Sequence, residues 1–223
     1  MQSITKKYGQ KVALNDINLS LETGKIVGLL GPNGSGKTTM IKTIMRIIRE
    51  QKGTILVCGE KASYETRRNI SFMPDRNFLY NTMKVKEAIK YYSDVFNDFD
   101  ISYSDMLCQK LGLSKEDKIT SLSKGNLEKV ILMLTLSRKV PIYLLDEPLG
   151  SLDPVIKHEM LTVIKQASNN DNLILISTHL IKDTEEILDD AIFLNKGQIA
   201  DHFNIKESGK NLEAYYLEVF SNV

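Results

Sequence analysis

The stretch with the clearest chemical meaning is residues 31–39, GPNGSGKTT. It fits the pattern G-x-x-x-x-G-K-[ST], in which a glycine-rich backbone curls so that its N–H groups point at phosphate oxygens. The Lys37 ammonium reaches the β- and γ-phosphates, and the Thr38 hydroxyl can coordinate Mg²⁺. The residues expected to hold the nucleotide here are Asn33, Gly34, Ser35, Gly36, Lys37, Thr38 and Thr39. An apolar run precedes the motif and a helix-period stretch follows it, which is the context the motif requires.

A second chemical signal is a pair of acids, Asp146 and Glu147, that ends the apolar run IYLL. In proteins with such a phosphate-binding loop, an aspartate at this strand end helps to hold Mg²⁺. The adjacent Glu147 is placed to act on a water as general base, a role worth about 10²–10⁴ in rate. Two acids at a strand end are by themselves usually a solvated rim, but together with residues 31–39 they predict a catalytic site that contains Lys37 and Glu147.

Up to this point a kinase or a GTPase would also fit, and four shorter motifs distinguish the classes. They are residues 8–9 (YG), 122–126 (LSKGN), 148–154 (PLGSLDP) and 177–179 (STH). Each alone has an ordinary explanation. Tyr8 could be core, His179 could be structural, and Ser123 could cap the helix that we expect from Glu128 to Ser137 only across a gap.

The order and spacing of these motifs resemble those of the ATP-binding cassette (ABC) ATPases over essentially the whole chain. LSKGN is similar to the signature motif of that family, usually LSGGQ, PLGSLDP to its D-loop and His179 to its switch histidine. The resemblance implies an ABC transporter nucleotide-binding subunit that uses ATP and Mg²⁺. LSKG and the C-terminal stretch KESGKNLEAYYLEVF look most like the bacterial subgroup that exports antimicrobial peptides, lantibiotics and drugs.

The resemblance also implies roles for individual residues. Tyr8, stacked on adenine, and Val12 join the nucleotide-binding set, Glu147 and His179 act on the γ-phosphate end, and Thr38 and Asp146 hold Mg²⁺. Two such subunits stack head to tail, so that the signature of one acts on ATP bound by the other. The residues expected to act across that interface are Ser123, Lys124, Gly125 and Asn126 from the signature, and Ser151, Leu152 and Asp153 from the D-loop.

One position departs from the family. Asp75 stands where the family has a glutamine that contacts Mg²⁺ and the attacking water, and Arg76 beside it is expected to offset its charge. A carboxylate is a ligand that Mg²⁺ accepts, so we interpret Asp75 as a third metal-site residue, with a salt-bridged turn as the alternative. Phe78, Leu79 and Tyr80 follow as an apolar cluster that we expect to dock on a membrane subunit.

The elements that must position these residues read as an α/β fold. Continuous apolar runs (IVGLL, PIYLLD, NLILIST) predict parallel strands covered on both faces. The pieces KVALN, INLSLE, GTILV and NISFM, in residues 1–30 and 53–73, predict an attached antiparallel layer. Residues 84–139 read as a helical insertion, and Leu212, Tyr215, Tyr216 and Val219 as the docked face of a C-terminal helix. We therefore predict one ABC ATPase domain, residues 1–223, with a core (1–83 and 140–223) and a helical subdomain (84–139).

Composition limits the other possibilities. The 223 residues carry a net charge of +1, which gives no electrostatic reason to expect a nucleic-acid partner. Cys58 and Cys108 are isolated and read as two small buried side chains in a reducing compartment. No apolar run is long enough to cross a bilayer, so we expect a cytoplasmic protein held at the inner face of the cell membrane by permease subunits.

Two alternatives belong to other functional classes. One is a soluble ABC ATPase that serves cofactor assembly without transport. The other is a nucleotide-dependent binding module without turnover, which Glu147 and His179 disfavour.

Overall fold

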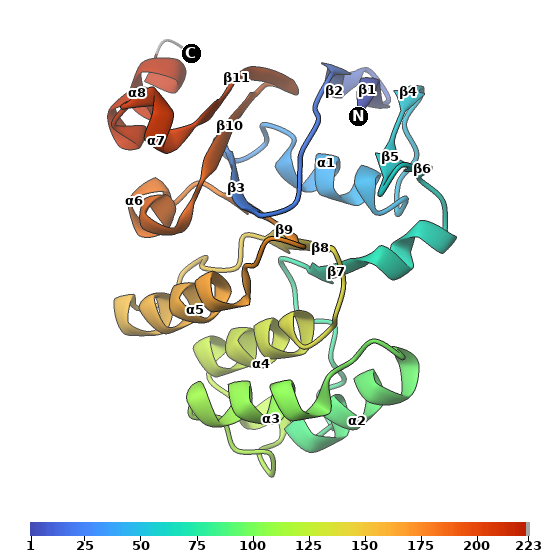
Figure 1. The fold of residues 1–223 in the computed structure, drawn as a ribbon, viewed down its shortest axis with the longest axis vertical. Coiled ribbons are helices and arrows are strands. Elements are labelled where there is room, and N and C mark those ends of the chain that lie inside the picture. Colours follow the sequence, from blue (N-terminus) through green and yellow to red (C-terminus); the bar gives the residue numbers. More distant parts are fainter. Residues whose placement is uncertain (222–223) are drawn as a thin grey trace.

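The centre of the structure is a six-stranded sheet with the order β11–β10–β3–β9–β8–β7 (Figure 1). The computed structural model of the chain describes residues 1–221. The strands of this sheet are β3 (Lys25–Leu30), β7 (Ile70–Met73), β8 (Ile142–Asp146), β9 (Leu173–Thr178), β10 (Asp190–Asn195) and β11 (Gln198–Asn204). Neighbouring strands are parallel except for β10 and β11, which form an antiparallel hairpin. The expected parallel sheet is confirmed, with one antiparallel strand added at its edge.

A second, smaller sheet is antiparallel and has the order β2–β1–β4. Its strands are β1 (Gln2–Tyr8), β2 (Lys11–Ile17) and β4 (Lys52–Thr54), and the short hairpin of β5 (Leu56–Val57) and β6 (Glu60–Lys61) follows it. The prediction for two segments is wrong. NISFM forms β7, which pairs in parallel with β8, and INLSLE is not a strand beyond Ile17. Parallel pairing of Ile70 with Ile142, far along the chain, is a long-range contact that local turn signals do not reveal.

Helices cover both faces of the central sheet. They are α1 (Lys37–Ile44), α2 (Val85–Val95), α3 (Ile101–Lys110), α4 (Lys124–Leu136), α5 (Pro154–Ala167), α6 (Ile181–Thr184), α7 (Ile205–Ser208) and α8 (Leu212–Ser221). Short 3₁₀ turns add η1 (Glu65–Asn69), η2 (Ile119–Ser121) and η3 (Glu185–Ile187). Figure 1 shows α2, α3 and α4 together at the end of the molecule opposite the small sheet. The predicted start of α4 at Glu128 is wrong, because Ser123 caps the helix directly by accepting a hydrogen bond from the Asn126 N–H.

The alternation of side chains along the strands produces two separate cores. In β3, Ile26 and Leu30 face one core, while Val27 and Leu29 face the other. The first core packs the sheet against α2–α5 and includes Leu212 of α8. The second core packs it against α1 and the small sheet through Met40, Ile41 and Leu14, among others. Because both faces are buried, the strand runs are continuously apolar.

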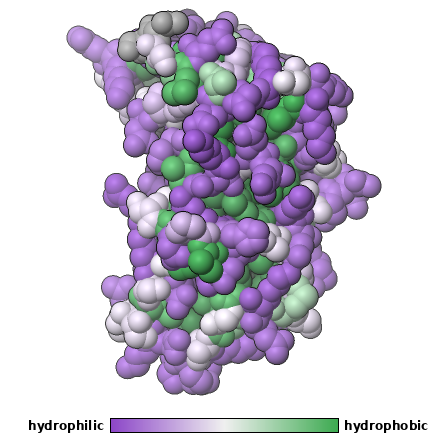
Figure 2. Space-filling view, turned by 90° about the vertical axis from the view of Figure 1, so that its left-hand side faces the viewer, coloured by the Kyte–Doolittle hydropathy of each residue, from purple (hydrophilic) through white to green (hydrophobic). Residues whose placement is uncertain are grey.

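The surface seen in Figure 2 is mostly hydrophilic, with apolar side chains in small separate patches. Within residues 1–221, no helix is both long enough and apolar enough to cross a membrane. Cys108 is buried as expected, but the prediction for Cys58 is wrong, because this residue is exposed. It lies in the tight turn between β5 and β6, with φ 51°, and it belongs to neither core.

Candidate nucleotide site

The loop between β3 and α1 is held in a shape that only glycine allows at two positions. Gly36 stands before α1 with φ 116°, and a Cβ there would lie 2.6 Å from the Ala13 carbonyl oxygen. A Cβ on Gly31 would overlap the carbonyl oxygen of Leu194. The N-terminus of α1 therefore opens directly onto the loop, and its free N–H groups and partial positive charge make an anion site.

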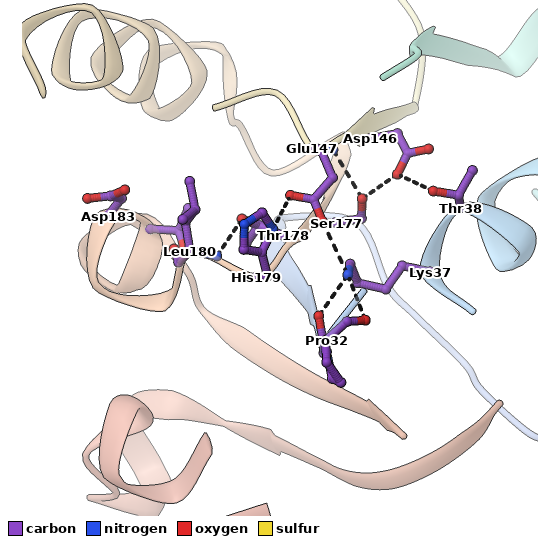
Figure 3. Close-up of polar contacts among 12 residues, drawn as sticks. Pro32, Lys37, Thr38, Asp146, Glu147, Ser177, Thr178, His179, Leu180 and Asp183 are labelled. Carbon is purple, nitrogen blue, oxygen red and sulfur yellow. Dashed lines mark hydrogen bonds and ion pairs between the residues drawn. The ribbon is translucent and has the colours of Figure 1, made fainter. Parts of the chain in front are cut away.

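Lys37 is the first residue of α1, and its side chain is only 5% exposed. Its ammonium donates hydrogen bonds to the carbonyl oxygens of Gly31 (2.7 Å) and Pro32 (3.4 Å) (Figure 3). It also lies 3.2 Å from Glu147 Oε1, close enough for an ion pair. A buried ammonium so placed at the mouth of the loop can neutralise a phosphate that enters there.

Asp146, at the end of β8, is fully buried. Its Oδ1 accepts hydrogen bonds from Ser177 Oγ (2.5 Å) and Thr38 Oγ1 (3.1 Å), which joins β8, β9 and α1 (Figure 3). Burial raises the pKa of the Asp146 carboxyl, those two hydrogen bonds counter the rise, and the charges of Asp75 and Glu147 add to it. Ser177 was not among the predicted site residues, although its place beside His179 at the strand end was a usable signal.

Glu147 bridges the two sides of the site. Its Oε1 faces Lys37, and its Oε2 lies 2.9 Å from His179 Nδ1, so one carboxylate links α1 with the segment after β9 (Figure 3). Its backbone has φ 53°, a left-handed conformation that is uncommon for a non-glycine residue, and its N–H donates to Ser177. Strained conformations of this kind persist where the surroundings fix them, and they cluster at active sites.

Lys37, Thr38 and Glu147 line a pocket of about 300 Å³. Its lining residues are Tyr8, Lys11, Ala13, Asn33, Gly34, Gly36, Lys37, Thr38, Thr39, Asp75 and Glu147. The sequence did not single out Lys11 and Ala13, although both lie within five residues of Tyr8. Val12, between them, is 38% exposed and does not line the pocket. The phosphate loop and an exposed aromatic ring thus meet in one hollow, as a nucleotide requires.

The donor set suits a hard divalent cation. Asp146 Oδ2 is buried and has no hydrogen-bond partner, while Oδ1 of the same carboxylate contacts the Thr38 hydroxyl. Mg²⁺ prefers such oxygen ligands and fills its other positions with water and phosphate oxygens. Among the described residues, no three His, Cys, Asp or Glu side chains gather into a metal cluster. The oxygen atoms that could contact a cation here are the Thr38 hydroxyl and the Asp146 carboxylate.

Asp75 lines the same pocket just after β7, with its side chain 38% exposed. Arg76 lies 4.0 Å from it and is 89% exposed. An ion pair this open and long contributes little, so Arg76 does not neutralise Asp75, contrary to the expectation that it would offset the charge. The three residues of the apolar cluster expected to dock on a membrane subunit differ in exposure. Phe78 and Tyr80 are exposed, but Leu79 is 7% exposed and packs in the core.

The signature and D-loop residues lie outside this pocket and have structural roles of their own. Gly125 is buried, and a Cβ there would overlap Cδ1 of Ile156 on α5. Asp153 caps α5 by accepting hydrogen bonds from the N–H groups of Val155 and Ile156. Ser123, Lys124 and Ser151 are exposed, and Asn126 and Leu152 are half-buried. In the described part of the chain, these two segments therefore do not line the chain's own nucleotide pocket.

A comparison with protein families matches residues 14–150 to the ABC transporter family. The chain belongs to that family. It is 30% identical over 210 residues to the ABC transporter ATP-binding protein YtrB of Bacillus subtilis, covering 93% of this chain and 72% of the relative. It is 27% identical to the lantibiotic transport ATP-binding protein SrtF of Streptococcus pyogenes, covering 100% of this chain and 95% of the relative.

The fold agrees with solved ABC structures. The ATP-binding subunit of an ABC transporter superposes with a TM-score of 0.87 at 24% identity, covering 97% of each chain. A dimeric ATP-binding cassette bound to ADP and Pi gives a TM-score of 0.80 at 21% identity, covering 92% of this chain and 97% of the other. The chain is thus an ATP-binding, ATP-hydrolysing subunit of an ABC transporter, and the kinase and GTPase classes are excluded.

Proposed function

We propose that the pocket binds ATP with its phosphates on residues 31–39 and its adenine against Tyr8, and that Glu147 is the general base. The observation that carries this is the position of the Glu147 carboxylate between Lys37 and His179 (Figure 3). A γ-phosphate that enters beside Lys37 replaces Glu147 as the partner of the ammonium. Glu147 is then free to polarise a water, while His179 contacts the γ-phosphate.

Thr38 and Asp146 hold Mg²⁺ in this proposal, with Asp75 as a third, outer group. The cation supplies neutralisation of the β- and γ-phosphate charges. The support is the unpartnered Asp146 Oδ2 next to the Thr38 hydroxyl, and the Asp75 carboxylate in the same pocket. The remaining nucleotide contacts fall to the other residues of the loop and to Val12, which lies in sequence between the pocket-lining Lys11 and Ala13.

A second ABC subunit completes the site in trans. Ser123, Lys124, Gly125 and Asn126 at the start of α4, with Ser151, Leu152 and Asp153, act on ATP bound by the partner. The exposure of Ser123 and Lys124, away from their own pocket, supports this arrangement. The N-terminus of α4 adds partial positive charge toward the partner's phosphates.

The transport reaction in this proposal is export of a peptide, drug or similar compound through separate membrane subunits. The support is the similarity to relatives named for lantibiotic transport and for Nod factor export. Phe78 and Tyr80, exposed near the start of α2, are the proposed contact with the membrane subunits. The subunit then lies at the cytoplasmic face of the membrane, and α2–α4 within residues 84–139 form its helical subdomain. No named relative reported above supports the cofactor-assembly alternative.

The test is Glu147→Gln, which keeps the size of the side chain but removes the base. We expect ATP turnover to fall by about 10²–10⁴, the usual contribution of a general base, while ATP binding persists. Retained ATP stabilises the closed pair, so the variant should elute as a dimer with ATP and as a monomer without it.

The matched control is Glu186→Gln, the same change at an exposed position in η3. It should leave turnover and elution unchanged. Substantial turnover by Glu147→Gln would remove Glu147 as the base.

A further inference from the structure

The segment that follows His179 is held between two other helices. His179 leads into α6, a helix of only four residues, and then into η3. Figure 1 shows α6 between α5 and α8. A helix this short cannot hold its own position, because helix nucleation is unfavourable without tertiary contacts. What fixes the backbone beside His179 is therefore the packing around α6.

On one side, α6 is tied to the helix that follows the D-loop. Lys157 of α5 lies 2.5 Å from Asp183 of α6, and both side chains are partly buried. Asp153, in the D-loop, caps the start of the same α5. The D-loop helix and the segment after His179 are thus joined by one ion pair.

On the other side, α6 and η3 are tied to the C-terminal helix. The Glu185 carboxylate accepts a hydrogen bond from the backbone N–H of Leu212, the first residue of α8 (3.2 Å). Leu212 itself is fully buried in the core. Lys182 and Glu213 add a more exposed ion pair at 3.0 Å. A carboxylate at a helix N-terminus satisfies a free N–H and meets the positive end of the helix dipole.

The C-terminal helix is in turn fixed to the central sheet. Tyr215 packs edge-on against Phe193 of β10 at 5.1 Å between ring centroids, and its hydroxyl donates to Asp201 of β11 at 2.5 Å. Tyr216 of the same helix is near enough to the site that the Glu147 charge adds to the rise in its pKa caused mainly by burial. A rigid path therefore runs from β10 and β11 through α8 to the residues after His179.

We propose that α8 fixes the position of α6 and η3, the segment that follows His179. Glu185 is then a positioning residue that holds His179 against Glu147 through this segment. This inference rests on the proposed role of His179. It adds that the position of the C-terminal helix α8 determines whether His179 stays in contact with Glu147. When α8 is displaced, the His179–Glu147 contact loosens while the phosphate loop stays intact.

The experiment compares Glu185→Ala, Glu185→Gln and the control Glu186→Ala in ATPase assays. Loss of one charge-assisted hydrogen bond should lower kcat about three- to tenfold in Glu185→Ala. KM for ATP should not change, because Tyr8 and residues 31–39 lie elsewhere. Glu185→Gln keeps an oxygen acceptor and should restore most of kcat, and Glu186→Ala should behave as the wild type. Hydrogen exchange of residues 179–187 should be faster in Glu185→Ala alone.

The double variant Glu185→Ala/His179→Ala separates positioning from general destabilisation. Its single-turnover rate should equal that of His179→Ala alone, since Glu185 acts only through His179. The inference would be overturned if Glu185→Ala left kcat unchanged. It would also be overturned if Glu185→Ala lowered the rate by the same factor in the His179→Ala variant as in the wild type. Full activity of His179→Ala would instead overturn the proposed role of His179, which keeps the two failures distinguishable.

Discussion

Asp146 is a site residue whose buried, ionised carboxylate lowers the stability of the folded chain. Its carboxylate is fully buried, has one oxygen without a partner, and has a raised pKa caused chiefly by burial. A pKa that is higher in the folded than in the unfolded chain means that ionisation of this group opposes folding. The opposition grows as the pH rises through the folded-state pKa and is absent well below the unfolded-state value.

Asp146→Asn should therefore be more stable than the wild type at neutral pH without nucleotide, by about 0.5–2 kcal/mol. The amide oxygen can still accept from Ser177 and Thr38, and the charge is gone. Urea unfolding measures the gain, which should shrink as the pH is lowered, and Asp171→Asn, at an exposed position, is the control. A lower stability of Asp146→Asn at neutral pH would mean that the hydrogen bonds from Ser177 and Thr38 stabilise the charged carboxylate by more than its burial costs.

Asp75 is the residue at which the chemistry of this chain can differ from that of its family. The carboxylate lines the pocket, its charge acts on Asp146, and Arg76 is too distant and exposed to cancel it. Asp75→Gln should raise the Mg²⁺ concentration for half-maximal ATPase activity about tenfold, a typical loss for an outer group of a metal site. Arg76→Ala should leave that concentration unchanged. Identical Mg²⁺ titrations of Asp75→Gln and the wild type would leave Asp75 as a turn residue.

At the scale of elements, the close contact between α4 and α5 explains why residue 125 is a glycine, without reference to any ligand. A Cβ on Gly125 would overlap Cδ1 of Ile156. Gly125→Ala should lower the free energy of unfolding by about 1–3 kcal/mol through overpacking. Gly125→Ala/Ile156→Val removes the overlapping methyl group and should recover most of the loss, as followed by urea unfolding, with Ile156→Val alone as the control. If the double variant regains stability but has no ATPase activity, Gly125 also has a role in contacting the nucleotide bound by the partner.

Sequence patterns predicted correctly those elements whose type can be read from their own residues alone. The runs that became β3, β8 and β9 and the docked face of α8 were read correctly, because apolar continuity and helix spacing are local signals. The sheet in which β7 pairs was not, since a four-residue strand (ISFM) fits either sheet and only the pairing with the distant β8 decides. The site followed the same rule. Residues 31–39 and Glu147 carry recognisable motifs, whereas Lys11 belongs to no motif and joins the site only through folding.

At the scale of the whole molecule, the chain contains two halves of different sites. Its own pocket gathers the phosphate loop, Asp75 and Glu147, while the start of α4 and the D-loop lie outside the pocket lining. In the proposed pair, a two-fold arrangement of two such chains would put each half next to its complement, because an isologous interface repeats every contact. Complete sites would then exist only in pairs, and activity would depend on association.

Mixing two inactive variants tests this directly. Lys37→Ala should disable the pocket of its own chain, and Ser123→Arg should disable the signature presented to the partner. A mixed pair retains one intact site, formed by the pocket of the Ser123→Arg chain and the signature of the Lys37→Ala chain. An equimolar mixture should regain ATPase activity up to roughly a quarter of wild type, because half of the pairs are mixed and each has one of two sites. Either variant alone, at the same total concentration, is the control. A mixture as inactive as its components, although cross-linking shows mixed pairs, would mean that two copies of this chain do not share a site.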